Sequence, residues 1–326
     1  MGVSESFLSQ LPEGYMTRAP TLDDVEAVVA LERACVAAGV STGPSSAVDL
    51  RRHWEDPHRQ DGDEDTLVIA PDGRVVGYLE YFQAEPFTDF EFEAYVHPEH
   101  AVIAGALLEA VEAKARHSAH LAPDGERVVL LGYTVSTSQD MQRLLSTRGF
   151  AHHRDGLTME IELTEQPPQP VWPPGVAVRR FVPGQDERAV WETLEASWQD
   201  QYGYSPMSFE EFVYYRITAQ TDFDASLWLL AVDGEAVVGI LLGLPGSKGI
   251  ADTGRISVVG VLREHRKRGI GLALMYESFN EFWQRKYSKV NLGVDASSLT
   301  GADRLYERAG MREVGRTVSY EKVLRE

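Results

Sequence analysis

The chain has 326 residues, which is long for one compact domain and suits two domains of about 150 residues each. Its formal net charge of −19 opposes contact with the phosphates of nucleic acids, and no apolar run is long enough to span a membrane. The single cysteine, Cys35, excludes an intramolecular disulfide and a cysteine metal cluster. No basic and then apolar leader opens the sequence, so we expect a cytoplasmic protein.

The first half of the chain predicts one domain over residues 15–164, after a tail at residues 1–14. A strand is expected at 15–18 and a helix at 23–38, which carries Cys35 as a small buried side chain. The histidines are scattered, and none pairs with acids at a recognised metal spacing. No metal is therefore expected.

A proline-rich stretch separates the two halves. Residues 165–176 include Gln166-Pro-Pro-Gln-Pro170 and Pro173-Pro174-Gly175, a composition that favours extended, semi-rigid backbone. We therefore predict a linker at 165–176 and a second domain over 177–326. The second domain should open with a strand at 177–181, a helix at 186–198 and a hairpin at 227–243 that turns at Asp233-Gly234.

The most informative segment of the second half is the stretch at 261–274, V-L-R-E-H-R-K-R-G-I-G-L-A-L. An apolar strand leads into three cations and two glycines, and an amphipathic helix follows. Backbone N–H groups and the helix dipole concentrate partial positive charge at a helix start, and glycines let phosphates approach the main chain. The pattern therefore favours a loop that binds a diphosphate.

Several kinds of loop share this outline. A Walker loop needs Gly-Lys-Ser/Thr where this chain has Ile270-Gly271-Leu272, and a dinucleotide fingerprint needs a third glycine where it has Leu274. An ordinary basic helix cap is the simplest alternative. Arg266-x-x-Gly269-x-Gly271 after an apolar strand instead resembles the coenzyme A pyrophosphate loop of the GNAT family of N-acetyltransferases.

The rest of the second half follows the order of that family. A strand (290–294), a polar segment (295–304), a Leu-Tyr-x-x-x-Gly segment (305–310) and a closing strand (314–324) come after the loop. The resemblance implies an α/β (α+β) fold, with a mixed, mostly antiparallel sheet flanked by helices, and acetyl-CoA as co-substrate. By position it assigns coenzyme binding to Val259, Gly260, Val261, Arg266, Lys267, Arg268, Gly269, Ile270, Gly271, Leu272 and Ser298.

The resemblance also implies catalytic roles. A tyrosine at the place of Tyr306 often protonates the departing thiolate in the family, which ordinary pKa values of about 10 and 8.5 make feasible; core packing is the alternative role. Main-chain groups of Val259 and Val261 would hold the thioester carbonyl. Ser298 stands where many relatives have an asparagine. The general base is not assigned, and its candidates are Glu195, Asp252 and Asp295.

The acceptor remains open. Trp198, Tyr202 and Tyr204 end the first helix of the second domain, a region that lines the acceptor pocket in the family, and surface packing explains them equally well. The segment at 254–261 most resembles mycothiol synthases, which have an acidic residue where this chain has Arg255. An antibiotic, an amino acid, a polyamine and a peptide are all compatible, and the acidic chain suits a cationic amine.

The first half resembles the second half but lacks the residues that the resemblance assigns to coenzyme binding and catalysis. Residues 70–77 parallel 231–239, and 144–150 parallel 305–311. When Val96 is aligned with Val261, the first half has no counterpart of the loop cations or glycines, and Leu145 replaces Tyr306; the residues at the loop positions are Ala101, Val102, Ile103, Ala104 and Ala106. We therefore predict two tandem GNAT-like domains, degenerate over 15–164 and catalytic over 177–326.

The predicted function is transfer of an acetyl group from acetyl-CoA to a primary amine of a small molecule, by direct attack in a ternary complex. The protein would act as a monomer or a homodimer, without nucleic acid or membrane as partner. The alternative is a non-catalytic module that senses acyl-CoA. Tyr306 favours the enzyme, because a sensor needs the loop but no acid.

Overall fold

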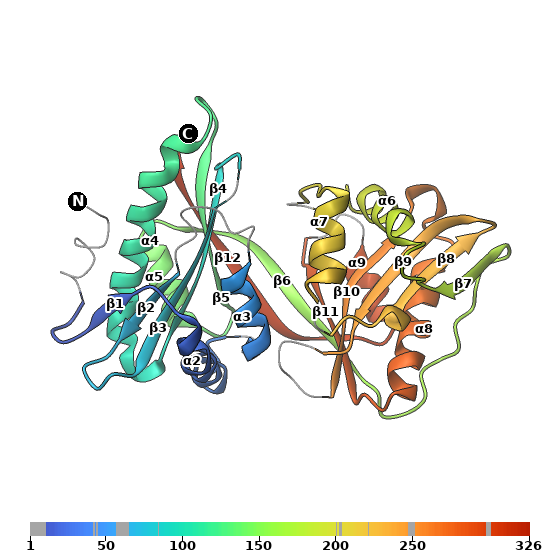
Figure 1. Ribbon diagram of the computed structural model, residues 1–326, viewed down its shortest axis with the longest axis horizontal. Coiled ribbons are helices and arrows are strands. Elements are labelled where there is room, and N and C mark those ends of the chain that lie inside the picture. Colours follow the sequence, from blue (N-terminus) through green and yellow to red (C-terminus); the bar gives the residue numbers. More distant parts are fainter. Residues whose placement is uncertain are drawn as a thin grey trace. The chain divides into compact units, whose positions relative to one another are not determined.

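The computed structural model describes residues 11–41, 43, 45–56, 65–83, 85–199, 201, 204–220, 222–246, 252–297 and 301–326. The chain forms two compact units, whose elements are labelled in Figure 1. Unit 1 comprises Met1–Gly156 and Gly315–Glu326, and unit 2 comprises Leu157–Val314. In the described part of the chain, no helix has the length and apolar character needed to cross a membrane.

Unit 1 is a sheet with helices on both faces. Its strands are β1 (Met16–Arg18), β2 (Thr66–Ile69), β3 (Val75–Gln83), β4 (Asp89–Val96), β5 (Val128–Val135) and the first part of β6 (Ala151–Glu162). Its helices are α2 (Val25–Ala37), α3 (Ala47–Glu55), α4 (Ala104–Ser118) and α5 (Gln139–Thr147), with a 3-10 turn at Pro98–Ile103 before α4. The sheet is antiparallel except between β4 and β5.

Unit 2 has the same plan. It begins with the last part of β6. Its other strands are β7 (Val176–Arg180), β8 (Trp228–Asp233), β9 (Ala236–Leu244), β10 (Thr253–Val261) and β11 (Lys289–Asp295). Its helices are α6 (Glu187–Trp198), α7 (Phe209–Val213), which continues as a π-helical turn at Tyr214–Thr218, α8 (Ile270–Gln284) and α9 (Ala302–Arg308). The parallel pair here is β10 with β11, so both units have the expected mixed, mostly antiparallel sheet.

The last strand of the chain, β12 (Arg312–Arg325), is shared. The boundary between the units falls inside β12, and its larger part, from Gly315 on, pairs antiparallel with β5 of unit 1. In Figure 1 the red end of the chain accordingly runs beside green β5. Val318 and Tyr320 are buried in the core of unit 1, so the end of the chain completes its first half.

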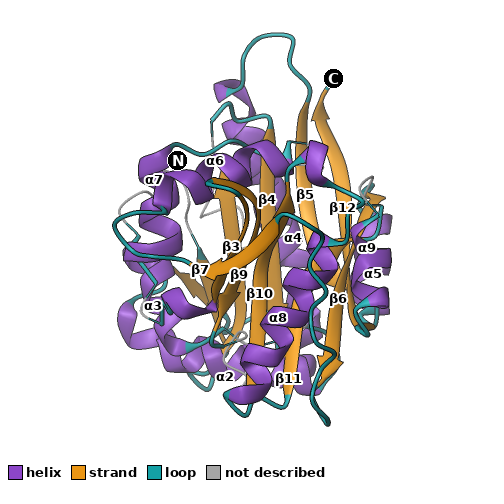
Figure 2. Ribbon diagram, turned by 90° about the vertical axis from the view of Figure 1, so that its right-hand side faces the viewer, coloured by secondary structure: helices purple, strands orange, loops and turns teal. Residues whose placement is uncertain are grey.

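Each sheet is covered by apolar helix faces on both sides. In unit 2, α8 places Leu274, Phe279 and Phe282 in the cluster that lies against β8, β9 and β10 (Figure 2). The helices α6 and α7 place Val190, Leu194 and Phe212 in the second cluster. In unit 1, α4 belongs to one cluster and α2 to the other.

The two units repeat one side-chain contact, which supports the internal repeat. In unit 1, both terminal nitrogens of Arg18 donate to the carboxylate of Asp24 at 2.5 and 2.6 Å. In unit 2, Arg179 makes the same two-pronged contact with Asp186 at 2.6 and 2.8 Å. Arg18 lies on β1 and Arg179 on β7, and each aspartate lies at the start of the helix that follows, α2 or α6. These contacts fix that helix to the strand before it in both units.

The predicted boundaries need correction. Residues 157–164 belong to unit 2 and residues 315–326 to unit 1, because β6 and β12 each run from one unit into the other. The proline-rich stretch is also part of unit 2 rather than a separate linker. Asn280 on α8 donates to the carbonyl of Pro168 at 2.9 Å, and Trp172 packs against the core. Of the predicted tail, residues 1–10 lie outside the described residues, and Leu11 packs on the core of unit 1.

Candidate functional site

The site in unit 2 begins where two parallel strands separate. β10 pairs with β11 only from Thr253 to Arg255, and β10 then continues to Val261 paired with β9 alone. Leu262 donates its N–H to the carbonyl of Val238 on the β9 side. Because backbone groups alternate along a strand, those of Val259 and Val261 face the side from which β11 diverges.

The carbonyl groups at this fork already accept hydrogen bonds from side chains. The indole nitrogen of Trp198 donates to the carbonyl of Val259 at 3.2 Å, and Nε of Arg266 donates to the carbonyl of Val261 at 3.0 Å. The main-chain N–H groups of the same two residues point into the same gap. Gly260, between them, permits close helix packing, because a Cβ there would lie 2.3 Å from Oγ of Ser197 on α6.

The turn after β10 leads into the N-terminus of the 15-residue helix α8. Gly269 has φ +93°, a left-handed conformation that favours glycine, and a Cβ there would meet no atom within 4 Å. The first bond inside the helix runs from Ala273 to Gly269, so the N–H groups of Ile270, Gly271 and Leu272 have no acceptor within the helix. These groups and the open approach at Gly269 fit a diphosphate.

Gly271 is needed for a different reason. A Cβ on Gly271 would lie 3.1 Å from a methyl carbon of Leu305, so this glycine lets α9 pack closely against the start of α8. The side chain of Ile270 is buried and that of Leu272 is partly buried, and both pack in the core of unit 2. Gly271 therefore serves the packing of α9, whereas a Cβ at Gly269 would meet open space.

The three loop cations differ in position. Arg266 turns back onto the protein, since a terminal nitrogen donates to the carbonyl of Ser197 at 2.9 Å in addition to its bond with Val261. Arg268 lies 3.5 Å from the carboxylate of Asp233. Lys267 is exposed and has no ion pair with any residue that the structure describes. The sequence places all three at the phosphates; in the structure, the Arg266 guanidinium binds main-chain carbonyls and Arg268 lies beside a carboxylate.

Tyr306 lies on α9 and is buried, with 8% of its surface exposed. Burial raises the pKa of its phenol to about 12. It belongs to the core cluster of unit 2, so it has the packing role that the sequence analysis gave as the alternative. Ser298 lies outside the described residues.

Trp198, Tyr204 and Glu195 gather on the α6 side of the fork. The rings of Trp198 and Tyr204 lie 6.4 Å apart in an edge-to-face arrangement, and Tyr202 lies outside the described residues. Burial and the nearby carboxylate of Glu195 raise the pKa of Tyr204. The bond from Trp198 to Val259 brings this group to the fork itself.

The other two candidate bases lie at opposite ends of the strands. Asp252 precedes the first residue of β10, and its carboxylate lies 3.3 Å from the N–H of Ser288. This is the end of β10 away from Val261. Asp295 ends β11, on the fork side, and accepts from the N–H of Ser297 at 2.6 Å. Glu195 and Asp295 thus lie on elements that reach the fork, whereas Asp252 lies at the far end of β10.

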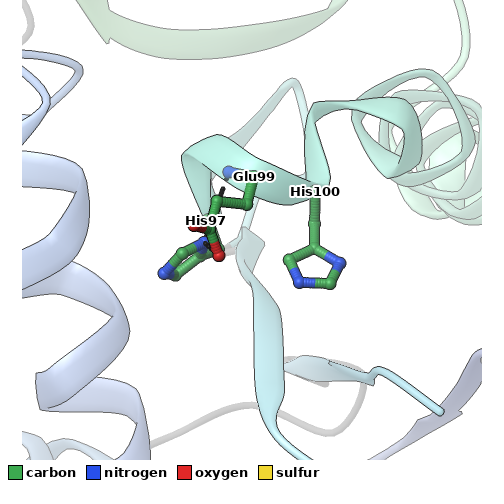
Figure 3. Close-up of side chains that lie close together, drawn as sticks. All are labelled: His97, Glu99 and His100. Atoms are coloured by element: carbon green, nitrogen blue, oxygen red, sulfur yellow. Dashed lines mark hydrogen bonds and ion pairs between the residues drawn. The ribbon is translucent and has the colours of Figure 1, made fainter. Parts of the chain in front are cut away.

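The described residues contain one group of side chains with metal-ligand chemistry, and it lies in unit 1. Figure 3 shows His97, Glu99 and His100 on the turn after β4, with ligand atoms within 4.8 Å of one another. Sequence spacing did not indicate this group. The guanidinium of Arg74 lies 3.5 Å from Nε2 of His100 and 4.0 Å from the carboxylate of Glu99, and its positive charge opposes a metal cation there.

The parallel strands of unit 2 thus separate next to a glycine turn and a helix N-terminus, the arrangement that the resemblance of the loop implied. Residues 189–311 match the model of the acetyltransferase (GNAT) family. The chain belongs to this family, whose members use acetyl-CoA as co-substrate, and it is an N-acetyltransferase. Its fold, tandem layout and family thus confirm the resemblance drawn from the loop.

The similar proteins are of the same kind. The mycothiol acetyltransferase of Kytococcus sedentarius is 30% identical over 273 residues, covering 81% of this chain and 83% of that protein. The one from Saccharopolyspora erythraea is 30% identical over 267 residues, covering 78% and 85%. A GCN5-related N-acetyltransferase from Sphaerobacter thermophilus is 37% identical, with a TM-score of 0.81 over 97% of this chain and 98% of that one.

A more distant structure supports the arrangement in two repeats. A tandem GNAT protein from the clavulanic acid biosynthesis pathway is 15% identical, with a TM-score of 0.72 over 96% of this chain and 99% of that one. At this identity the likeness concerns the fold alone.

Proposed function

We propose that unit 2 transfers the acetyl group of acetyl-CoA to a primary amine of a small molecule, by direct attack in a ternary complex. The observation that carries this proposal is the fork between β10 and β11, which lies at the turn into α8. The first-turn N–H groups of α8 and the exposed Lys267 would hold the diphosphate. The thioester would then lie along the fork.

The main-chain N–H groups of Val259 and Val261 would stabilise the carbonyl oxygen. As the amine nitrogen bonds to the carbonyl carbon, negative charge develops on that oxygen, and donors already in place lower the barrier. The carbonyl of Val259 is held by Trp198, and that of Val261 by Arg266. These two side chains fix the direction of the strand and hence the direction of both N–H groups.

Tyr306 is proposed as the donor to the leaving sulfur. Burial raises its pKa to about 12, so its proton stays on the phenol oxygen in the resting enzyme. A hydrogen bond to sulfur strengthens as the C–S bond breaks and negative charge develops there. The sulfur gains a proton and the amine loses one. Glu195 or Asp295 would accept the amine proton, directly or through water.

Release of free thiol from acetyl-CoA in the presence of an amine panel tests the function. A thiol reagent is suitable because the only cysteine of the chain, Cys35, is buried. We expect release that depends on the acceptor. Tight coenzyme binding without acceptor-dependent release would instead favour the acyl-CoA sensor and contradict the proposal.

A further inference from the structure

Unit 1 has its own fork, and this fork encloses a cavity. β4 and β5 pair from Asp89 to Glu93, and both strands continue beyond the last pair, Glu93 with Tyr133. His97 donates its N–H to the carbonyl of Val76 on the β3 side, so the backbone groups of Val96 face the gap. A cavity of about 420 Å³ opens here, and every residue that lines it belongs to unit 1.

The walls of this cavity are apolar and aromatic, and its charged groups are mostly acidic. Cys35, Met141 and Leu144 line it together with the rings of Tyr95 and Tyr133. Two carboxylates, Glu93 and Asp140, and the imidazole of His97 are its ionisable groups besides these tyrosines and the thiol. Among the described residues that line it there is no lysine or arginine. Such a lining favours a cation with an apolar body over an anion.

Glu93 is the central polar group. It lies at the point where the strands separate, and it accepts a hydrogen bond from the hydroxyl of Tyr95. Burial first, and then the charges of Glu93, Glu80 and Glu32, raise the pKa of Tyr95 well above its ordinary value. Several carboxylates thus act on one wall of the cavity. A carboxylate oxygen can accept a second hydrogen bond, and the aromatic rings beside it suit an ammonium group.

The turn beyond β4 opposes a diphosphate. With Val96 aligned to Val261, Ala101 and Ile103 stand at the positions of Arg266 and Arg268, and Ala104 and Ala106 stand at those of the loop glycines. The 3-10 turn Pro98–Ile103 runs directly into α4, and the N–H of Ala104 already donates to the carbonyl of Ala101. The ligand of this cavity is therefore a compact molecule without phosphate groups.

We infer that the cavity of unit 1 binds a small primary amine, with the ammonium group on the carboxylate of Glu93 and the apolar part among Tyr95, Tyr133 and Met141. The amine need not be acetylated, so this site stands apart from the reaction proposed for unit 2. A second amine site in the same chain would let unit 1 hold or sense an amine while unit 2 carries out the transfer.

Methionine methyl NMR can report the two units separately. The chain has seven methionines; Met141 lines the cavity, whereas Met207 and Met275 belong to unit 2. The probes are benzylamine, benzyl alcohol and benzoate, which share one ring and differ in charge, together with coenzyme A. We expect benzylamine to shift the Met141 signal in a saturable way. Benzyl alcohol should bind at least tenfold more weakly, and benzoate and coenzyme A should leave Met141 unchanged.

Two variants and a control test the residue assignment. Glu93→Gln should weaken benzylamine about tenfold, the loss of one charge-assisted contact, and leave benzyl alcohol unchanged. Glu126→Gln removes the same charge from an exposed loop of unit 1 and should bind like the wild type. If Glu93→Gln fails to fold, Val40→Trp, which fills the cavity from a loop, should abolish the Met141 response.

An unmoved Met141 signal, equal binding of benzoate, or an unchanged affinity in Glu93→Gln would overturn the amine site. Coenzyme A is expected to act on the signals of unit 2. If it does not, the function proposed for unit 2 fails and the cavity of unit 1 is unaffected.

Discussion

Replacing Arg266 with methionine tests whether this guanidinium supports the loop or contacts the coenzyme. Two of its hydrogen bonds, to Val261 at 3.0 Å and to Ser197 at 2.9 Å, tie the end of β10 to α6. A hydrogen bond from a charged group contributes about 1.5–3 kcal/mol. Because this side chain is only partly buried, we expect the pair together to contribute about 2–3 kcal/mol. That corresponds to a fall of about 5–10 °C in melting temperature.

Lys267→Met is the matched variant, because Lys267 is exposed and has no ion pair with the described residues. One exposed cation beside a diphosphate contributes about 1 kcal/mol at low salt, or about fivefold in Kd. We expect Lys267→Met to melt like the wild type and to lose coenzyme affinity only at low salt. Arg266→Met should melt earlier, and its loss of affinity should persist in 1 M salt. Calorimetry of unfolding and of coenzyme binding measures both. Arg266→Met with a normal melting temperature and a loss that vanishes in 1 M salt would refute the supporting role.

Three further predictions follow from the same contacts. Tyr306→Phe should lower turnover about a hundredfold in thiol-release assays, by the same factor from pH 6 to pH 9, because a phenol of pKa about 12 stays protonated there. The coenzyme Kd of this variant should stay unchanged, and the control variant Tyr276→Phe should turn over like the wild type. Full activity of Tyr306→Phe would exclude the donor role. The Arg18 guanidinium lowers the pKa of Asp24 from 3.8 to about 2, a stabilisation that is present above pH 4 and lost as the pH falls through 2. Asp24→Asn should therefore unfold about 1 kcal/mol more easily at pH 7, since Arg18 is half exposed, with most of this difference gone at pH 2 in urea titrations; an equal difference at both pH values would contradict this. Deleting residues 315–326 should remove hydrogen-exchange protection from β5 and α4 and leave α8 protected, because β12 pairs with β5; retained protection of β5 would show that unit 1 folds without it.

Much of the fold could be predicted from local patterns. The Asp233-Gly234 turn between two apolar runs predicts the hairpin of β8 and β9, and the spacing of Leu274 and Phe282 predicts the buried face of α8. The exchange of β12 could not be predicted this way. An alternating strand specifies which face is buried but not which neighbour it pairs with, so residues 315–326 gave no local sign that they complete unit 1.

The sequence predicted the glycine turn before α8, but it did not predict the directions of the side chains around that turn. Gly269 follows from the need for a left-handed conformation at the start of α8, which the sequence motif encodes. The direction of Arg266 depends on carbonyl groups of Val261 and Ser197 that only the folded chain brings together. Trp198 belonged to a suspected acceptor region, but its bond to Val259 depends on how closely α6 approaches β10.

The two forks differ at one residue on the strand. In unit 2, Gly260 lets α6 approach until a Cβ would lie 2.3 Å from Oγ of Ser197, and Trp198 then reaches the strand. With Val96 aligned to Val261, unit 1 has Tyr95 at this position, and its ring packs with the residues of α2. A phenol ring between strand and helix keeps the two apart, which leaves room for a cavity beside Glu93. Loss of the strand glycine therefore accounts for a pocket in unit 1, just as loss of the loop glycines accounts for its unsuitability for a diphosphate.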